Sequence, residues 1–401
     1  MSASKLFISA LMASGLAMVA ADDTCSGGAK ISSQSDADAL GSCSTYTGDI
    51  TISNQVQTPL TFNGIKKVTG DFTANGAVNI TSISAPLLSE IGGHFSLISI
   101  NALTSLSMPT LISVGDITFK ALANLQGLDF TKGVNTAGSV SITNTGLTSL
   151  QGIELNSVGQ LDLTANDYLT EVNVNNMKNI SGPLTISNNN NKLTIDFPNL
   201  VTAKDMTFRN TSSISVPSLA NLTGALGLYG NFISNFSAPN LTSCTDVGLD
   251  SNGHLETLSL PQLTTLSGGL AISNNGKLES IDLPKLSHVD GAIDLTGSFT
   301  NVSFPALKYV HGGFNAQSTA NFSCDDIEAE KEAIHGSFNC TSTATPTTID
   351  GSSGSNDTSG GSGTSSGSSG SATSSGAAVA GFVVPSMGLT AVLGGLLSLL
   401  M

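Results

Sequence analysis

The amino-acid sequence predicts an all-β protein, built as a parallel β-solenoid of about 13 coils with short helical caps. Three observations carry this prediction. Strand-like openings recur every 20 to 23 residues, an Asn follows many of these openings, and an apolar-Pro-x-Leu step closes many of the same repeats. A repeat this short excludes a solenoid of helix pairs, which needs more than about 30 residues per repeat.

The strand series is defined by the first apolar residue of each opening. These residues are Ile50, Phe72, Phe95, Ile117, Val140, Leu161, Leu184, Met206, Leu226, Val247, Leu270, Ile293 and Phe314. Within one repeat the apolar residues alternate over a strand length, as in Leu270-x-Ile272. Each coil should therefore add short strands that pair in parallel with the coils before and after it.

Two further series keep the same register. The Asn series is Asn54, Asn75, Asn144, Asn166, Asn188, Asn210, Asn231, Asn252 and Asn274. The Pro series is Pro86, Pro109, Pro198, Pro217, Pro239, Pro261, Pro284 and Pro305, and Pro excludes regular helix there. Asn tolerates a left-handed corner and its amide can bond the next Asn, so we expect a structural Asn ladder. Both series lapse near Ile117–Val140, the expected seam if two abutting domains replace one rod.

The two ends of a solenoid need caps, because they expose strand edges and apolar core. The segment "SDADALGSC" predicts a helical cap within residues 22–49, and "CDDIEAEKEAIHG" predicts a second one that ends the solenoid region 50–340. We expect disulfides within the pairs Cys25 and Cys43, and Cys324 and Cys340, each contributing about 3 kcal/mol. Cys244 is expected to be a buried free thiol, and an intermolecular disulfide is the alternative.

The terminal segments predict targeting signals. Residues 1–21 have the pattern of a cleaved secretory signal, and a retained membrane anchor is the alternative. Residues 341–376 form a Ser/Thr/Gly-rich stalk, and residues 377–401 are apolar. This order is typical of a GPI signal that is removed on maturation, with Gly376 as the expected attachment residue. A type I membrane span is the alternative.

Composition and sequons agree with secretion. The formal net charge is −15, which makes nucleic acid and anionic lipid headgroups poor partners. Asn-x-Ser/Thr sequons predict N-glycosylation at Asn79, Asn179, Asn210, Asn221, Asn235, Asn240, Asn301, Asn321, Asn339 and Asn356.

The residues show no pattern of catalytic chemistry. Glycoside hydrolysis needs two carboxyl groups about 5–9.5 Å apart across the sugar. The pairs Asp22-Asp23 and Asp325-Asp326 lie at the mature N-terminus and in a cap, and Arg209 is the one Arg of the chain. Asp282 and Asp294 sit beside strand residues, where most carboxylates are solvated. The five His residues are dispersed without metal-ligand spacing. We therefore expect no catalytic residue, cofactor or metal.

The segment "DADALGSCSTYTGDITIS" resembles the opening of a receptor L-domain, in which a short helix precedes a Cys, a Gly and the first strand. Here these are Cys43, Gly48 and Ile50. L-domains are right-handed β-helical coils related to leucine-rich repeats. With its tail, stalk and sequons, the chain resembles fungal GPI-anchored cell-wall organisation proteins from about residue 25 to residue 401.

The resemblance implies a surface glycoprotein on the outer leaflet of the plasma membrane and in the cell wall. It implies a non-catalytic role in wall organisation and integrity, with wall polysaccharide or wall proteins as partners. Two alternatives remain. A receptor-like ectodomain would bind one protein or peptide ligand, and a β-helix hydrolase would release reducing ends from polysaccharide.

Overall fold

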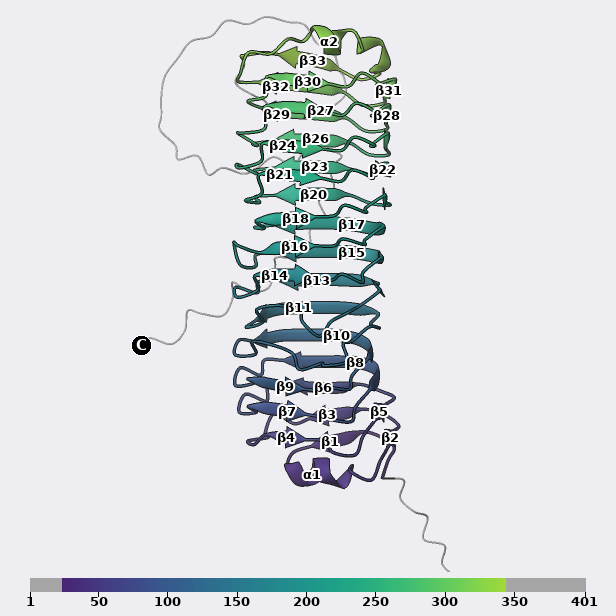
Figure 1. Ribbon diagram of the computed structural model, residues 1–401, viewed down its shortest axis with the longest axis vertical. Coiled ribbons are helices and arrows are strands. Elements are labelled where there is room, and N and C mark those ends of the chain that lie inside the picture. The colour runs from purple at the N-terminus through teal and green to yellow at the C-terminus, as the bar shows by residue number, and fades with distance from the viewer. Residues whose placement is uncertain (1–23, 344–401) are drawn as a thin grey trace, which may run out of the picture.

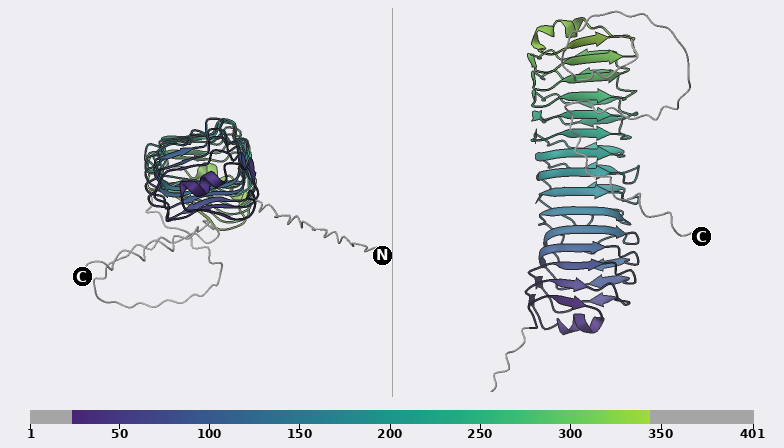
Figure 2. Two further views of the ribbon diagram at one scale, coloured as in Figure 1. Left: turned by 90° about the horizontal axis from the view of Figure 1, so that it is seen from below. Right: turned by 180° about the vertical axis from the view of Figure 1, so that it is seen from behind.

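The computed structural model describes residues 24–343, and these form a parallel β-solenoid, as the repeats predict (Figure 1). The coils stack along one axis and superpose when the rod is viewed end-on (Figure 2). The predicted signal segment, most of the stalk, the GPI signal with Gly376, and Asn356 lie outside the described residues. None of the helices within 24–343 is long and apolar enough to cross a membrane.

Each coil contributes strands to up to three faces, which we call the first, second and third face. The first face holds β1 (Ala29–Ile31), β3 (Ile50–Ile52), β6 (Phe72–Asn75), β11 (Ser139–Thr145), β13 (Gln160–Thr164), β20 (Leu226–Tyr229), β23 (Val247–Asp250), β26 (Leu270–Ser273), β29 (Ile293–Gly297), β32 (Phe314–Ser318) and β33 (Phe338–Thr341). Four longer strands run from the second face onto the first: β8 (Glu90–Ile98), β10 (Ser113–Leu122), β15 (Asn179–Ser187) and β17 (Thr202–Arg209).

The other two faces carry shorter strands. The second face holds β2 (Thr45–Tyr46), β5 (Lys67–Val68), β12 (Ser157–Val158), β19 (Asn221–Leu222), β22 (Ser243–Cys244), β25 (Thr265–Leu266), β28 (His288–Val289) and β31 (Tyr309–Val310). The third face holds β4 (Leu60–Thr61), β7 (Ser82–Ser84), β9 (Ser105–Ser107), β14 (Glu171–Asn173), β16 (Thr194–Asp196), β18 (Ser213–Ser215), β21 (Asn235–Ser237), β24 (Thr257–Ser259), β27 (Ser280–Asp282) and β30 (Asn301–Ser303).

The register of the first face is the register that the sequence series predicts. Ile50 pairs with Phe72, and Phe72 pairs with Phe95. The series also begins one coil earlier than predicted, because β1 pairs with β3, and it continues to β33, which pairs with β32. The expected cap segment 22–49 therefore holds two strands of the solenoid, β1 and β2, as well as a helix.

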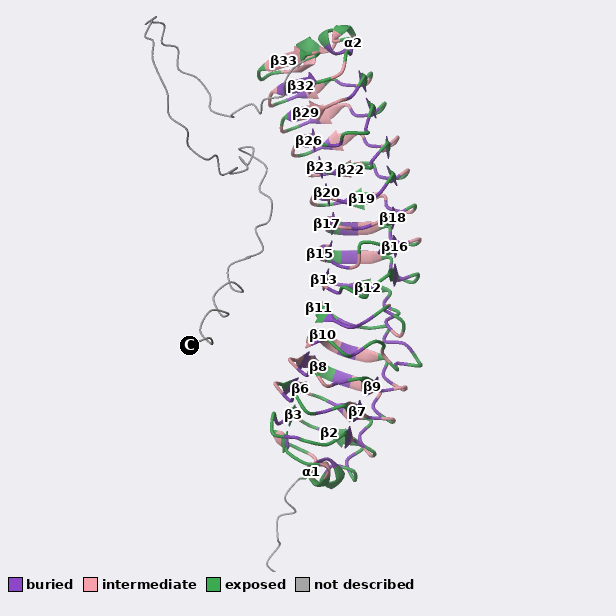
Figure 3. Ribbon diagram, turned by 90° about the vertical axis from the view of Figure 1, so that its left-hand side faces the viewer, coloured by how far each residue is buried: buried purple, intermediate pink, exposed green. Residues whose placement is uncertain are grey.

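The core runs the length of the rod, and Figure 3 shows buried residues in strands all along it. Buried Leu, Ile, Val and Phe side chains from every coil form one continuous cluster. Four Phe rings stack edge to face in the N-terminal half, with centroids 5.3, 5.7 and 5.1 Å apart from Phe62 through Phe72 and Phe95 to Phe119. Such aromatic contacts add to the stabilisation that burial provides.

Both ends are covered by helices. At the N-terminal end, α1 (Gln34–Ala39) is closed by a capping box between Ser33 and Asp36. At the other end the helix is shorter than the predicted segment: α2 (Asp325–Glu328) is followed by a 3₁₀ turn, η1 (Lys331–Ala333). Ile327 and Ile334 pack against the core as expected. The chain then extends into β33 and adds another rung.

The expected seam near Ile117–Val140 is not a domain boundary. Strands β10 and β11 pair there in parallel, with Ile117 opposite Val140, and the first and second faces belong to one 23-stranded sheet. In one coil the second face is reduced to a single bridge, Ser113–Thr136, and the larger irregularity lies on the third face. Its strands stop after β9 and resume at β14, and single bridges such as Ser107–Asp129 and Ser149–Glu171 join the coils between.

Candidate functional site: a groove on the third face

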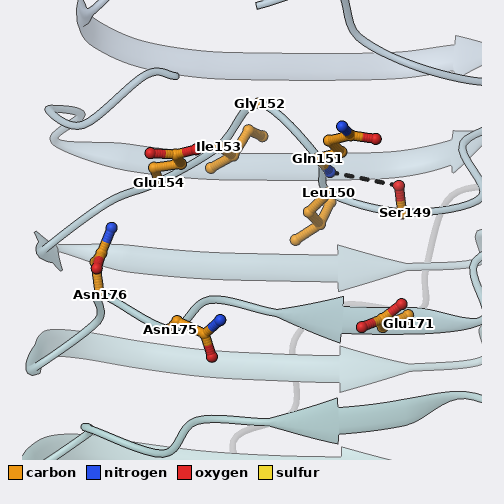
Figure 4. A pocket seen from close by; sticks show the side chains of 9 residues that line it. All are labelled: Ser149, Leu150, Gln151, Gly152, Ile153, Glu154, Glu171, Asn175 and Asn176. Carbon is orange, nitrogen blue, oxygen red and sulfur yellow. Dashed lines mark hydrogen bonds between the residues drawn. The ribbon is translucent and has the colours of Figure 1, made fainter. Parts of the chain in front are cut away.

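The gap in the third face produces a hollow on the side of the rod. In the coil of residues 147–158, Ser149–Glu154 form a turn that stands above the next coil, where Glu171 begins β14 and Asn175 and Asn176 follow its end (Figure 4). The hollow between them has a volume of about 470 Å³. A second hollow of about 210 Å³ adjoins it at Gln151, Gly152 and Glu154 and reaches Leu128–Thr131. We call the two together the side groove.

The shape of the turn follows from its sequence. Gly152 has φ +92° and Gly133, in the coil before it, has φ +73°, conformations that favour glycine. A Cβ on Gly133 would lie 2.7 Å from the Glu154 carboxyl carbon, so the glycine leaves room for this side chain. Val134 and Ile153 form a bridge that holds the two coils together here.

The floor of the side groove is apolar and its walls are polar. Leu150 and Ile153 are each 3% exposed and belong to the core. Gln151, Glu154 and Asn176 are exposed, and their side chains make no hydrogen bond or ion pair with any described residue. These groups are solvated in the free protein and available to a ligand.

Sequence reasoning missed this groove, although a signal was present. Pro109 and Pro198 flank the gap in the Pro series. Within the gap, Asn175 occupies the position that Pro198 holds in the next coil. The side-chain Nδ2 of Asn199, the residue after Pro198, donates to the backbone carbonyl of Asn175 at 2.7 Å and so links the two positions. The interruption of the Pro series predicted a seam between two domains. In the structure it marks the coils that lack a strand on the third face.

Both predicted disulfides are confirmed. Cys25 bonds Cys43, which ties the start of the described chain to the segment after α1. Cys324 bonds Cys340, which ties the start of α2 to β33. Cys244 is a free thiol, 4% exposed, as expected. Burial, together with the nearby Asp246 carboxylate, raises the pKa of this thiol to about 12.

The sequons in residues 24–343 all lie at the surface. Asn79, Asn221, Asn235, Asn240, Asn301 and Asn321 are exposed, and Asn179, Asn210 and Asn339 are partly exposed. Their glycosylation stays a prediction. Their distribution is uneven, because no sequon occurs between Asn79 and Asn179, the stretch that contains the whole side groove.

Seven of the nine residues in the Asn series divide into two neighbouring columns, and Asn54 and Asn75 belong to neither, which corrects the single ladder expected. Asn144, Asn188, Asn210 and Asn274 take left-handed backbone at the corner. Asn166, Asn231 and Asn252 belong to a second column, together with Thr145, Asn189, Thr211 and Asn275, and this column is buried. Its amides bond from coil to coil: the Asn252 Oδ1 accepts from the backbone N–H and the Nδ2 of Asn231, each at 3.0 Å.

Three His residues that look dispersed in sequence meet around Tyr309. The ring of His288 stacks on Tyr309 with centroids 4.5 Å apart, His335 lies 4.8 Å away, and the Tyr309 hydroxyl is 3.0 Å from Nδ1 of His311. Parallel register places these side chains on consecutive coils. Even so, within residues 24–343 no three His, Cys, Asp or Glu side chains are arranged to hold a metal ion.

The carboxylates considered for catalysis are not brought together. Asp282 lies in β27 on the third face and Asp294 in β29 on the first, where its Oδ1 accepts from Asn315 at 2.7 Å. Asp325 begins α2, and the guanidinium of Arg209 lies 4.4 Å from the centre of the Tyr229 ring. Asp22 and Asp23 lie outside the described residues.

Comparison with known proteins decides the family. The chain is 51% identical to "Protein ecm33" of Aspergillus fumigatus, over 82% of this chain and 83% of that protein. It is 42% identical to a "Cell surface GPI-anchored protein" of Arthroderma benhamiae, over 83% and 85% of the two chains. It is 34% identical to "Cell wall protein ecm33" of Schizosaccharomyces pombe, over 80% and 77%. This chain belongs to the Ecm33 family.

Membership of the Ecm33 family confirms the resemblance to fungal cell-surface and cell-wall proteins. These relatives are named as cell-surface or cell-wall proteins and not as enzymes. No protein-family model and no solved structure matches the chain. The stacked parallel coils of the structure agree with the L-domain-like coils that the resemblance implies.

Proposed function

We propose that this protein is a non-catalytic, GPI-anchored surface glycoprotein that supports the organisation and integrity of the fungal cell wall. It acts by holding a rigid β-solenoid among the polymers and proteins of the wall. The observation that carries this function is the combination of one continuous parallel sheet over the whole rod with Ecm33-family membership. The names of the relatives place them at the cell surface and in the wall.

The absence of catalytic activity is part of the proposal. It is supported by Asp282 and Asp294, which lie on different faces of the rod, and by relatives that are named for their location. A protein of this kind would act through position and binding. Parallel coils that each contact only their neighbours give a long object whose side chains stand in regular rows.

The anchor is tested by replacing Gly376, Ala377 and Ala378 with Phe in the full chain. Bulky residues at the attachment site should block transfer to the lipid, since that site needs small residues. We expect most of the variant protein to lack membrane attachment. The fraction of total protein that a phosphatidylinositol-specific phospholipase releases from membranes should therefore fall. The matched control is Gly360→Phe in the stalk, which should anchor normally.

The same strains test the role in the wall. Cells without the protein should be sensitive to wall-perturbing dyes, and the wild-type chain should restore resistance while the tail variant should not. A tail variant that is still lipid-anchored would contradict the anchor assignment. Release of reducing ends from wall polysaccharide by the purified protein would contradict the non-catalytic assignment.

A further inference from the structure

We propose that the side groove binds a segment of a neutral, hydroxyl-rich polysaccharide chain. This inference rests on the proposed function, because it names the wall component that the rod would contact and the place of contact. Four observations support it: the break in the repeat, the free polar groups, the local charge and the absence of sequons.

The groove lies where two successive coils of the described rod have no strand on the third face. Elsewhere short parallel strands cover this face, as β16 and β18 do with Thr194 opposite Ser213. Between β9 and β14 the coils instead project the Ser149–Glu154 turn. The main hollow of about 470 Å³ is within the range of about 300–1,000 Å³ typical of ligand sites.

The side chains along the groove have unused hydrogen-bonding capacity. The amides of Gln151, Asn175 and Asn176 each offer donors and an acceptor, and the Glu154 carboxylate offers acceptors. None of these four side chains has a hydrogen-bond partner within the described chain. Sugar hydroxyls both donate and accept, so a glycan can pair with amides and carboxylate together.

The charge of the groove excludes anionic ligands. Asp129, Glu154 and Glu171 are carboxylates on its rim or walls. Asp129 already accepts from the hydroxyls of Ser107 at 2.6 Å and Thr131 at 2.9 Å, which shows how hydroxyl groups satisfy carboxylates on this face. A phosphorylated glycan or a nucleic acid would be repelled, whereas a neutral glycan would not.

No groove residue belongs to a sequon, and the nearest sequon begins at Asn179, where β15 starts on the second face. No sequon occurs between Asn79 and Asn179, so no N-glycan of the protein originates within the stretch Ser149–Asn176. The remaining sequons follow from Asn179 onward, toward the C-terminal end. On the third face a polymer can therefore reach the groove without meeting a glycan attached to the groove residues themselves.

The test uses the full-length glycosylated protein, extracted in detergent and mixed with insoluble β-glucan, chitin or mannan in separate arms. The decisive variant is Lys178→Thr, which places a Thr two residues after Asn176 and so creates a sequon at the groove. Lys178 is exposed, and its backbone carbonyl, which the substitution keeps, makes the bonds to the next coil. Lys178→Ala is the matched control without a sequon. A second variant, Gln151→Ala with Glu154→Ala and Asn176→Ala, removes the polar groups directly.

We expect the wild type and Lys178→Ala to be retained by at least one of the three polysaccharides, and the arms identify which. Retention should fall at least tenfold for the glycan-bearing variant and for the triple variant, with unchanged circular dichroism. Two results would overturn the inference: equal retention of all variants, or no retention of the wild type on any arm. Neither depends on membrane anchoring, so failure here is distinct from failure of the proposed function.

Discussion

At the scale of single residues, the buried Asn column supplies hydrogen bonds that a solenoid corner otherwise lacks. Asn252 is fully buried, its Oδ1 accepts from Asn231, and its Nδ2 donates to the Leu228 carbonyl at 2.9 Å. A backbone that turns a corner inside the protein leaves groups that no strand partner reaches, and an unpaired buried polar group is costly. The Asn side chains satisfy these groups from one coil to the next.

This role predicts different effects for two neighbouring Asn residues. Asn252→Leu removes the acceptor of Asn231 and the donor to Leu228, and should lower the free energy of unfolding by about 3 kcal/mol. Asn274→Gly should lower it by at most about 1 kcal/mol, because Asn274 is exposed, its amide loses only the surface hydrogen bond to Asp250 at 2.8 Å, and Gly accepts its φ of +56°. Urea unfolding followed by circular dichroism measures both, and equal midpoints would refute a structural role for the buried column.

At the scale of elements, the caps differ in how they are held. Helix α1 has a capping box and lies on the first coil, whereas α2 has no side-chain cap. The N-terminal cap is fastened by the disulfide Cys25–Cys43, whose residues are 18 positions apart. The C-terminal cap is fastened by Cys324–Cys340, whose residues are 16 positions apart. Because each coil contacts only its neighbours, a loss of stability at one end should stay at that end.

Removing one disulfide should therefore loosen one end of the rod. Replacing Cys25 and Cys43 by Ser should cost about 3 kcal/mol locally and speed amide exchange in β1 and β3. Amide exchange in β32 and β33 should not change. The matched variant, Cys324→Ser with Cys340→Ser, should show the reverse pattern. If either pair speeded exchange along the whole rod, the coils would unfold as one unit.

At the scale of the whole molecule, the rod is a stack of interchangeable coils apart from the side groove. Val247 pairs with Leu270 just as Leu226 pairs with Val247, so one period can be removed without changing the register. The gap in the third face does not interrupt the first, where β10 and β11 remain paired. Continuity of one sheet keeps the rod whole while another face carries an irregular surface.

Deleting one full period tests this modularity. Removal of residues 247–269 joins Asp246 to Leu270 and should give a folded, secreted rod shorter by about 5 Å, measured by small-angle X-ray scattering. Removal of residues 247–257 deletes about half a coil and should prevent folding, because a third-face segment would then follow Asp246 where the first face needs a strand opposite Leu226. A folded half-coil variant, or an unfolded full-period variant, would contradict the coil register.

The sequence by itself determined the period, the strand order, both disulfides and the burial of Cys244. These properties follow from patterns that repeat along the chain, because parallel pairing between neighbouring coils places equivalent residues above one another. The recurrence of an apolar residue such as Ile50 or Phe72 at the same place in each repeat therefore predicts that its side chain is buried in the core.

Only the tertiary structure decided the rest. It separated the two Asn columns, gathered three His around Tyr309, and turned the lapse of the Pro series into a groove. Periodicity shows where a repeat fails but does not show the result. Whether a departing turn closes over its neighbour or leaves a hollow depends on the relative heights of adjacent coils. It depends also on which polar side chains, such as Gln151 and Asn176, find no hydrogen-bond partner among residues 24–343.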